Sequence, residues 1–170
     1  MNFRDATLKD AGAIAKLHMD SWRKNYSNDL SKEYLEYFAP AERSQLWNQR
    51  LSTPKQSQRV ILAEDHGSIV GFACVYIDEN EKWGSYLDNF HISEAYQNKG
   101  IGTALLEQVF ERCKADAKQT GLCLLVNQSN KKAQNFYLKN GARNQEPGIW
   151  NAPDGSSVPT FWFTWNSING

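Results

Sequence analysis

Residues 96–103 read Tyr96-Gln97-Asn98-Lys99-Gly100-Ile101-Gly102-Thr103 and stand between an apolar run typical of a strand and a periodic run typical of a helix. Two glycines in a turn let the backbone come close to a ligand. The first N–H groups of the following helix have no partner within the helix, and they carry the positive end of its dipole. Such a junction favours the binding of an anion, in particular a phosphate group.

Two common phosphate-binding loops do not fit this stretch. A dinucleotide-binding fingerprint requires Gly or Ala where Leu105 stands, and a P-loop requires lysine where Thr103 follows the second glycine. The pattern that does fit is Gln97-x-x-Gly100-x-Gly102, which resembles the acyl-CoA pyrophosphate loop of the GNAT superfamily of N-acyltransferases. A glycine turn before an ordinary helix has the same letters, so the interpretation depends on a second motif.

The second motif lies some thirty residues further on. It reads Asn130-Lys131-Lys132-Ala133-Gln134-Asn135-Phe136-Tyr137-Leu138-Lys139-Asn140-Gly141-Ala142 and is similar to the superfamily's Asn-x-x-Ala-x-x-Phe-Tyr-x-x-x-Gly sequence. The two motifs occur in the superfamily's order with a strand-like run between them. The chain is therefore identified by resemblance as a GNAT-type N-acetyltransferase over nearly its whole length.

The predicted elements agree with that resemblance. Strands are expected at 3–6, 60–64, 69–77, 83–92 and 122–126 and twice more near the C-terminus, and helices from Thr7 to about Tyr26, at 31–38 and 41–51 with a break at Pro40, from 101 to about Gly121, and from Ser129 or Asn130 to Gly141. The class is α/β. The resemblance implies a mixed, mostly antiparallel central sheet of about seven strands, flanked by helices and splayed between strands 4 and 5.

Composition excludes several other classes of protein. The chain has 170 residues, which suits a single domain spanning 1–170. Its 19 Lys+Arg balance 19 Asp+Glu, so charge predicts neither a nucleic-acid partner nor a membrane surface. We expect a cytoplasmic protein, because no apolar run approaches the ~20 residues needed to cross a bilayer and no basic segment precedes an apolar one at the N-terminus. Cys74, Cys113 and Cys123 show no metal-ligand spacing, so we expect buried thiols and no metal.

The resemblance implies acetyl-CoA as cosubstrate and assigns residues to it. Its pantetheine arm would lie between the diverging strands, and backbone amides of the glycine loop would surround the pyrophosphate. The implied acetyl-CoA-binding residues are Phe90, His91, Ile92, Gln97, Asn98, Lys99, Gly100, Ile101, Gly102, Thr103, Asn130, Phe136 and Tyr137. For Lys99 a solvated side chain is as good an interpretation, and Asn130 also fits a plain helix cap.

The implied reaction is attack of a neutral amine on the thioester carbon in a ternary complex. Tyr137 matches the family's general acid, which protonates the departing thiolate; the alternative is a core tyrosine beside Phe136. A backbone N–H near Ile92 would stabilise charge on the thioester oxygen.

The sequence does not identify the group that accepts the proton of the amine. An alkylammonium has a pKa near 10.4, so a base or a water chain must accept its proton first. Some relatives place a glutamate where Leu125 stands, and this departure puts a single dedicated base in doubt. Asp88, His91 and His18 are candidates, but each also fits a structural role.

The resemblance implies that the acceptor contacts mainly the first helices and the last hairpin. His18, Trp22 and Tyr26 recur every fourth residue and share one helix face, which either lines a substrate pocket or packs in the core as an aromatic stripe.

The sequence therefore leaves several hypotheses about the function of the protein. The first is transfer of acetyl to a primary amine of a small molecule or peptide; the others are acetylation of a protein N-terminus or lysine, and a non-catalytic acyl-CoA sensor. Three arginines could bind an anionic group on the acceptor or belong to a solvated helix face: Arg23, Arg43 and Arg50. The C-terminal hairpin would allow, without requiring, a homodimer.

Overall fold

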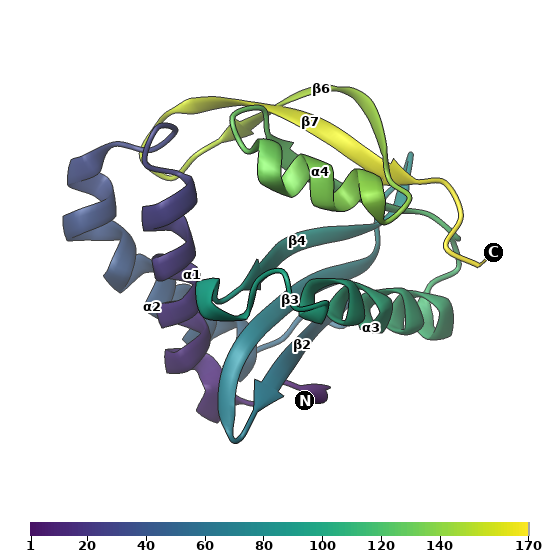
Figure 1. The fold of residues 1–170 in the computed structure, drawn as a ribbon, viewed down its shortest axis with the longest axis horizontal. Coiled ribbons are helices and arrows are strands. Elements are labelled where there is room, and N and C mark those ends of the chain that lie inside the picture. The colour runs from purple at the N-terminus through teal and green to yellow at the C-terminus, as the bar shows by residue number, and fades with distance from the viewer. Residues whose placement is uncertain (170) are drawn as a thin grey trace.

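The computed structural model of the chain describes residues 1–169, which contain one seven-stranded sheet with helices on both faces (Figure 1). The strands are β1 (Asn2–Asp5), β2 (Gln58–Asp65), β3 (Ser68–Asn80), β4 (Gly84–Ile92), β5 (Leu122–Asn127), β6 (Arg143–Asn151) and β7 (Ser157–Trp165). The helices are η1 (Leu8–Asp10), α1 (Ala11–Asn25), η2 (Tyr34–Phe38), α2 (Ala39–Ser52), η3 (Glu94–Tyr96), α3 (Ile101–Asp116) and α4 (Lys131–Lys139). None of these helices is long and apolar enough to span a bilayer.

The sheet has the order β1-β2-β3-β4-β5-β7-β6. Every neighbouring pair is antiparallel except β4 and β5, which are parallel. The predicted mixed, mostly antiparallel sheet of seven strands is thus confirmed.

Alternating side chains give the sheet two buried faces. Ile61 and Ala73 pack with α3 in one cluster, whereas their neighbours Leu62 and Cys74 pack with α1 and α2 in another. A period of two therefore assigns α1 and α2 to one face and α3 and α4 to the other. In Figure 1, α3 lies against the β2–β4 part of the sheet and α4 against the β6–β7 part.

The sheet opens between β4 and β5, as predicted. The two strands are in register only at Ser85↔Leu122 and Tyr86↔Cys123, and beyond these pairs they diverge. We call the region past Tyr86 and Cys123 the β4–β5 gap. It separates the half of the sheet covered by α3 from the half covered by α4.

Two glycines meet where this pairing begins. Gly84 has φ +95°, and a Cβ on it would lie 2.3 Å from the carbonyl oxygen of Gly121. A Cβ on Gly121 would lie 2.4 Å from the carbonyl oxygen of Trp83. The backbones can approach this closely only because both residues lack a side chain.

Two boundary predictions were wrong. Pro40 does not interrupt a helix, because the π-helical turn η2 runs directly into α2 and Pro40 is the second residue of α2. Gly121 does not end α3, which stops at Asp116; the glycine is needed for the contact with Gly84 instead.

Candidate active site

A cavity of about 790 Å³ occupies the β4–β5 gap and continues to the N-terminus of α3. Every residue assigned to acetyl-CoA from the sequence lines it, except Lys99 and Ile101. Ile101 packs in the core against Ala63 and Val70. The Lys99 ammonium lies 5.2 Å from the centre of the Tyr96 ring. The fold thus brings the two sequence motifs to one cavity.

The glycine loop has the backbone geometry that the motif predicts. Asn98 and Gly100 have positive φ angles of 60° and 79°, and Gly100 caps the N-terminus of α3. A Cβ on Gly102 would lie 3.1 Å from the Phe136 ring, so this glycine lets α3 and α4 approach each other. The loop and the Phe-Tyr motif are therefore in direct contact.

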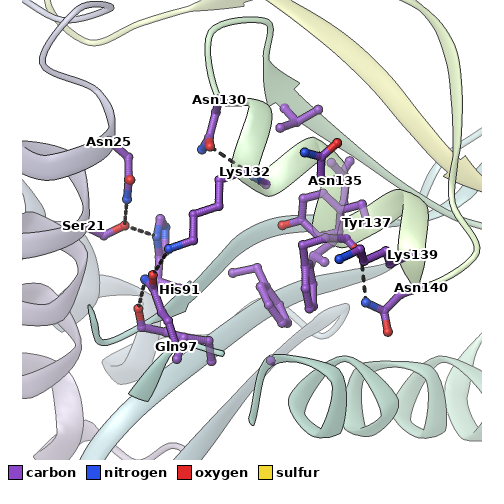
Figure 2. Close-up of a pocket in the computed structure, with 18 of the residues that line it drawn as sticks. Ser21, Asn25, His91, Gln97, Asn130, Lys132, Asn135, Tyr137, Lys139 and Asn140 are labelled. Atoms are coloured by element: carbon purple, nitrogen blue, oxygen red, sulfur yellow. Dashed lines mark hydrogen bonds between the residues drawn. The ribbon is translucent and has the colours of Figure 1, made fainter. Parts of the chain in front are cut away.

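Gln97 connects the loop to both sides of the cavity (Figure 2). Its Nε2 donates to the carbonyl oxygen of Ile92 at 2.9 Å, and its Oε1 accepts from the ammonium of Lys132. Lys132 reaches across from α4 and was not predicted as a site residue. The only signal for it was a lysine pair inside the second motif.

Asn130 is a helix cap, as one of its two interpretations predicted. Its Oδ1 accepts from the N–H of Ala133 at 3.1 Å, and the residue also lines the cavity. Capping fixes the side chain at the first turn of α4. Its role toward a cosubstrate stays a prediction.

Strand pairing determines which backbone groups of β4 are free. The N–H of Ser93 donates to the carbonyl of Val70 at 2.8 Å, so the antiparallel alternation turns the backbone groups of His91 toward β3 and those of Phe90 and Ile92 toward the gap. His91 reaches the cavity through its ring instead of its backbone.

Tyr137 is both a core residue and a cavity residue. Only 7 % of it is exposed, and its ring packs edge-on against Phe90, Phe136 and Trp165. Burial, with a smaller contribution from Tyr26, raises the pKa of the Tyr137 phenol well above its usual value. The hydroxyl is therefore protonated at neutral pH and available as a donor.

His91 is held by α1. Its Nδ1 is 2.7 Å from the Ser21 hydroxyl, which also accepts from Asn25 at 3.3 Å (Figure 2). Burial lowers the pKa of His91 to about 4. The imidazole is therefore neutral at pH 7 and binds a second proton only weakly.

Asp88 lines the cavity as half of an ion pair. Its Oδ2 accepts from Arg50 Nη2 at 2.7 Å, and Arg50 Nη1 donates to Asn89 at 2.7 Å. The Asp88 carboxylate therefore faces the cavity with its charge already paired to a guanidinium.

The predicted substrate pocket of His18, Trp22 and Tyr26 is corrected in two positions. His18 and Trp22 are 1 % and 4 % exposed and do not line the cavity, whereas Tyr26 does. His18 Nδ1 accepts from the Trp47 indole at 3.0 Å, and burial keeps the pKa of His18 well below its usual value. The stripe faces the core because α1 covers the sheet, and only Tyr26, the residue that caps the end of α1, reaches the cavity.

Residues 1–169 contain no cluster of three His, Cys, Asp or Glu side chains that could hold a metal ion.

The sequence matches the Acetyltransferase (GNAT) family over residues 14–142. The chain belongs to this family. It is 34 % identical over 106 residues to YuaI of Bacillus subtilis (strain 168), an uncharacterised N-acetyltransferase; the match covers 61 % of this chain and 58 % of that relative.

Solved GNAT structures share the fold. The GCN5-related N-acetyltransferase of Rhodopseudomonas palustris superimposes with a TM-score of 0.76 at 20 % identity, covering 96 % of this chain and 93 % of that one. PaiA N-acetyltransferase of Thermoplasma acidophilum, in complex with coenzyme A, gives 0.71 at 20 % identity and covers 96 % of each chain. YncA of Salmonella typhimurium, with its cofactor acetyl-CoA, gives 0.69 at 15 % identity, covering all of this chain and 95 % of that one.

The buried histidines of this GNAT chain predict its stability in acid. His91 binds its proton near pH 6.5 when unfolded but only near pH 4 when folded, so the unfolded state gains protons first as pH falls. The contribution of neutral His91 to the free energy of unfolding is therefore fully present above pH 6.5. About 3 kcal/mol of that free energy is lost as the pH falls from 6.5 to 4. Urea unfolding at several pH values should show the loss.

Two variants separate this effect from general acid denaturation. His91→Gln should flatten the decline between pH 6.5 and 4, and the matched control His66→Gln, at an exposed histidine, should leave it unchanged. Equal slopes in the wild type and His91→Gln would contradict the prediction.

Proposed function

We propose that this protein transfers the acetyl group of acetyl-CoA to a primary amine of a small molecule or peptide, by direct attack in a ternary complex. The observation that carries the proposal is the single cavity in which the glycine loop, the free edge of β4 and Tyr137 meet. Family membership supports the same chemistry.

The residues present fit coenzyme A at both ends of the cavity. At the α3 end, the first helical N–H groups are free for a pyrophosphate, and a Cβ on Gly100 would meet nothing within 4 Å, so the backbone there is open. In the β4–β5 gap, the backbone groups of Phe90 and the N–H of Ile92 lack a strand partner, and an arm with its own amides would satisfy them. The carbonyl of Ile92 already accepts from Gln97.

Each residue then has a defined task. Acetyl-CoA supplies a thioester-activated acetyl group. The N–H of Ile92 faces the gap and would donate to the oxygen on which charge develops. The protonated phenol of Tyr137 would donate to the sulfur as it leaves.

The amine proton has no single strong acceptor among the predicted residues. His91 has its pKa lowered to about 4, Asp88 is paired with Arg50, and His18 lies outside the cavity. We infer that a chain of water molecules carries the proton from the amine to bulk solvent before attack, so no one base variant should abolish turnover. Since Tyr137 lines the cavity, the catalytic function is favoured over a sensor that only binds acyl-CoA.

Ligand binding gives the first test. A hundredfold excess of acetyl-CoA over its Kd should stabilise the fold by about 2.7 kcal/mol, which corresponds to a rise in Tm of about 5 to 11 °C for a chain of this size. Differential scanning fluorimetry would measure it. ATP and NAD serve as controls. Equal rises in Tm with all three compounds would contradict the assignment of acetyl-CoA as the acetyl donor.

A further inference from the structure

One ring nitrogen of His91 is open to the cavity. The side chain is buried, with 9 % of the residue exposed, and its Nδ1 is 2.7 Å from the Ser21 hydroxyl. The other nitrogen, Nε2, makes no hydrogen bond with any described residue, yet the fold does not seal it from solvent as it seals the Nε2 of His18. Since His91 lines the cavity, its free Nε2 faces that space.

Hydrogen bonds from α1 decide which nitrogen of His91 carries the proton. The Ser21 hydroxyl accepts from Asn25 Nδ2 at 3.3 Å, and among the described residues His91 Nδ1 is the group to which it can donate (Figure 2). A neutral imidazole has one N–H donor and one acceptor nitrogen. Because Nδ1 accepts from the hydroxyl, the proton lies on Nε2. His91 therefore presents an N–H donor to the cavity.

The ring of His91 lies on the side of the sheet that α1 covers. Its centre is 5.0 Å from that of the His18 ring and 5.2 Å from that of the Phe72 ring. Phe90 and Ile92, its neighbours in β4, pack instead in the cluster that contains the residues of α3. The proposed cosubstrate occupies the gap and the N-terminus of α3. The α1 end of the cavity, where His91 lies, therefore remains for the acceptor.

A bulge in β4 brings a carboxylate to the same face. The pairing of β3 with β4 shifts between Cys74 and Val75, which leaves Asp88 without a partner in β3. Regular alternation would put Asp88 and His91, three residues apart, on opposite faces, and a bulge re-aims such a side chain. Asp88 thus reaches Arg50 of α2 and also lines the cavity. With a carboxylate already at this end, an uncharged oxygen is favoured over a second carboxylate as the partner of His91.

We propose that the N–H of His91 donates to a carbonyl or hydroxyl oxygen close to the amine of the acceptor, so that the protein selects amines that carry such an oxygen. This selection rests on the proposed acetyl transfer and names its substrate class. The carbonyl belongs to the first residue of a peptide or to an amino acid amide, and the hydroxyl to an amino alcohol. Either oxygen would satisfy a donor that the fold leaves open.

Three amines of similar size test the selection. Glycinamide has a carbonyl oxygen, ethanolamine has a hydroxyl and propylamine has neither. Turnover would be measured as release of the free thiol of CoA. Because the amines differ in basicity, each is compared between the wild type and a variant, and the basicity cancels in that ratio. In His91→Asn, whose amide is too short to replace Nε2, kcat/KM should fall about tenfold with glycinamide or ethanolamine and less than about twofold with propylamine.

Two further variants separate a lost donor from a damaged fold. His91→Gln has a longer amide that can place an N–H near the position of Nε2, so it should restore part of the preference. Ser21→Ala removes the bond that keeps the proton on Nε2, and it should lower kcat/KM for the same amine to a smaller extent. The matched control is Ser44→Ala, at an exposed serine of α2, which should behave as the wild type.

The pattern of losses distinguishes the possible outcomes. A larger loss with glycinamide would identify the carbonyl as the partner, and a larger loss with ethanolamine the hydroxyl. Equal losses with all three amines would mean that His91 acts on acetyl-CoA or on the fold, and would overturn the proposal while leaving the acetyl transfer intact. If none of the amines reacts in the wild type, the proposed transfer fails together with this selection. A rise in Tm with acetyl-CoA would then still support the donor.

A binding measurement gives a readout apart from turnover. With CoA present, calorimetry should show that N-acetylglycinamide or N-acetylethanolamine binds the wild type about tenfold more tightly than it binds His91→Asn. N-propylacetamide, which lacks the second oxygen, should bind both proteins alike. Equal affinities of the wild type and His91→Asn for all three products would contradict the role of His91 as a donor to the acceptor.

Discussion

Tyr137→Phe is expected to lower kcat by a hundredfold or more and to leave the Kd of acetyl-CoA nearly unchanged. General acid catalysis contributes roughly 10²- to 10⁴-fold, and the substitution removes only the proton donor. The ring keeps its edge-on contacts with Phe90, Phe136 and Trp165. Turnover would be followed by thiol release with an acceptor found in an amine screen, and affinity by calorimetry.

Tyr76→Phe is the matched control for this loss. Tyr76 is also buried and also has a pKa raised by burial, but it lies outside the cavity. Its replacement should leave turnover within about twofold of the wild type. An unchanged turnover rate in Tyr137→Phe would contradict the role as general acid and would leave Tyr137 with a structural role in the core.

Gly84→Ala is expected to lower the free energy of unfolding by about 3 kcal/mol or more. The new Cβ would lie 2.3 Å from the carbonyl oxygen of Gly121, so backbone must move, and the φ of +95° disfavours any residue with a side chain. Urea denaturation would measure the loss. Because the two glycines hold β4 and β5 together where their short pairing begins, the shape of the gap beyond it should change and acetyl-CoA affinity should fall as well.

Gly67→Ala isolates the conformational part of that cost. Gly67 has φ +79°, but a Cβ there would meet nothing within 4 Å. Only about 1 kcal/mol should be lost, from the left-handed backbone alone. Equal losses in the two variants would mean that the contact between Gly84 and Gly121 is unimportant.

The sequence was sufficient for the fold because its decisive features are local. Gln97, Gly100 and Gly102 identify a loop before a helix, and the second motif places Phe136 and Tyr137 one strand later. These segments line the cavity as expected. The helical and strand periods of the apolar residues predicted which segments form helices and strands. The errors concerned the boundaries of helices, as at Pro40.

Pairing between distant residues could not be predicted in the same way. The partners of Asp88 and His91 are Arg50 and Ser21, which lie 38 and 70 residues away in the chain. Those partners fix where the two side chains lie, and no local sequence pattern connects them. Periodicity likewise placed three aromatic residues on one face of α1 but could not say that the face turns toward the core.

The diverging strands also affect how the molecule avoids aggregation. An unpaired strand edge normally invites another chain to add to it and so to aggregate, and barrels or charged rims are usual defences. Here the exposed edge lies in the middle of the sheet, with residues of α3 and α4 lining the same cavity. A β-strand of another molecule has little room beside this edge, whereas a single extended arm with amide groups can enter. The enclosure therefore protects the edge from aggregation. It also limits which molecules can pair with the edge.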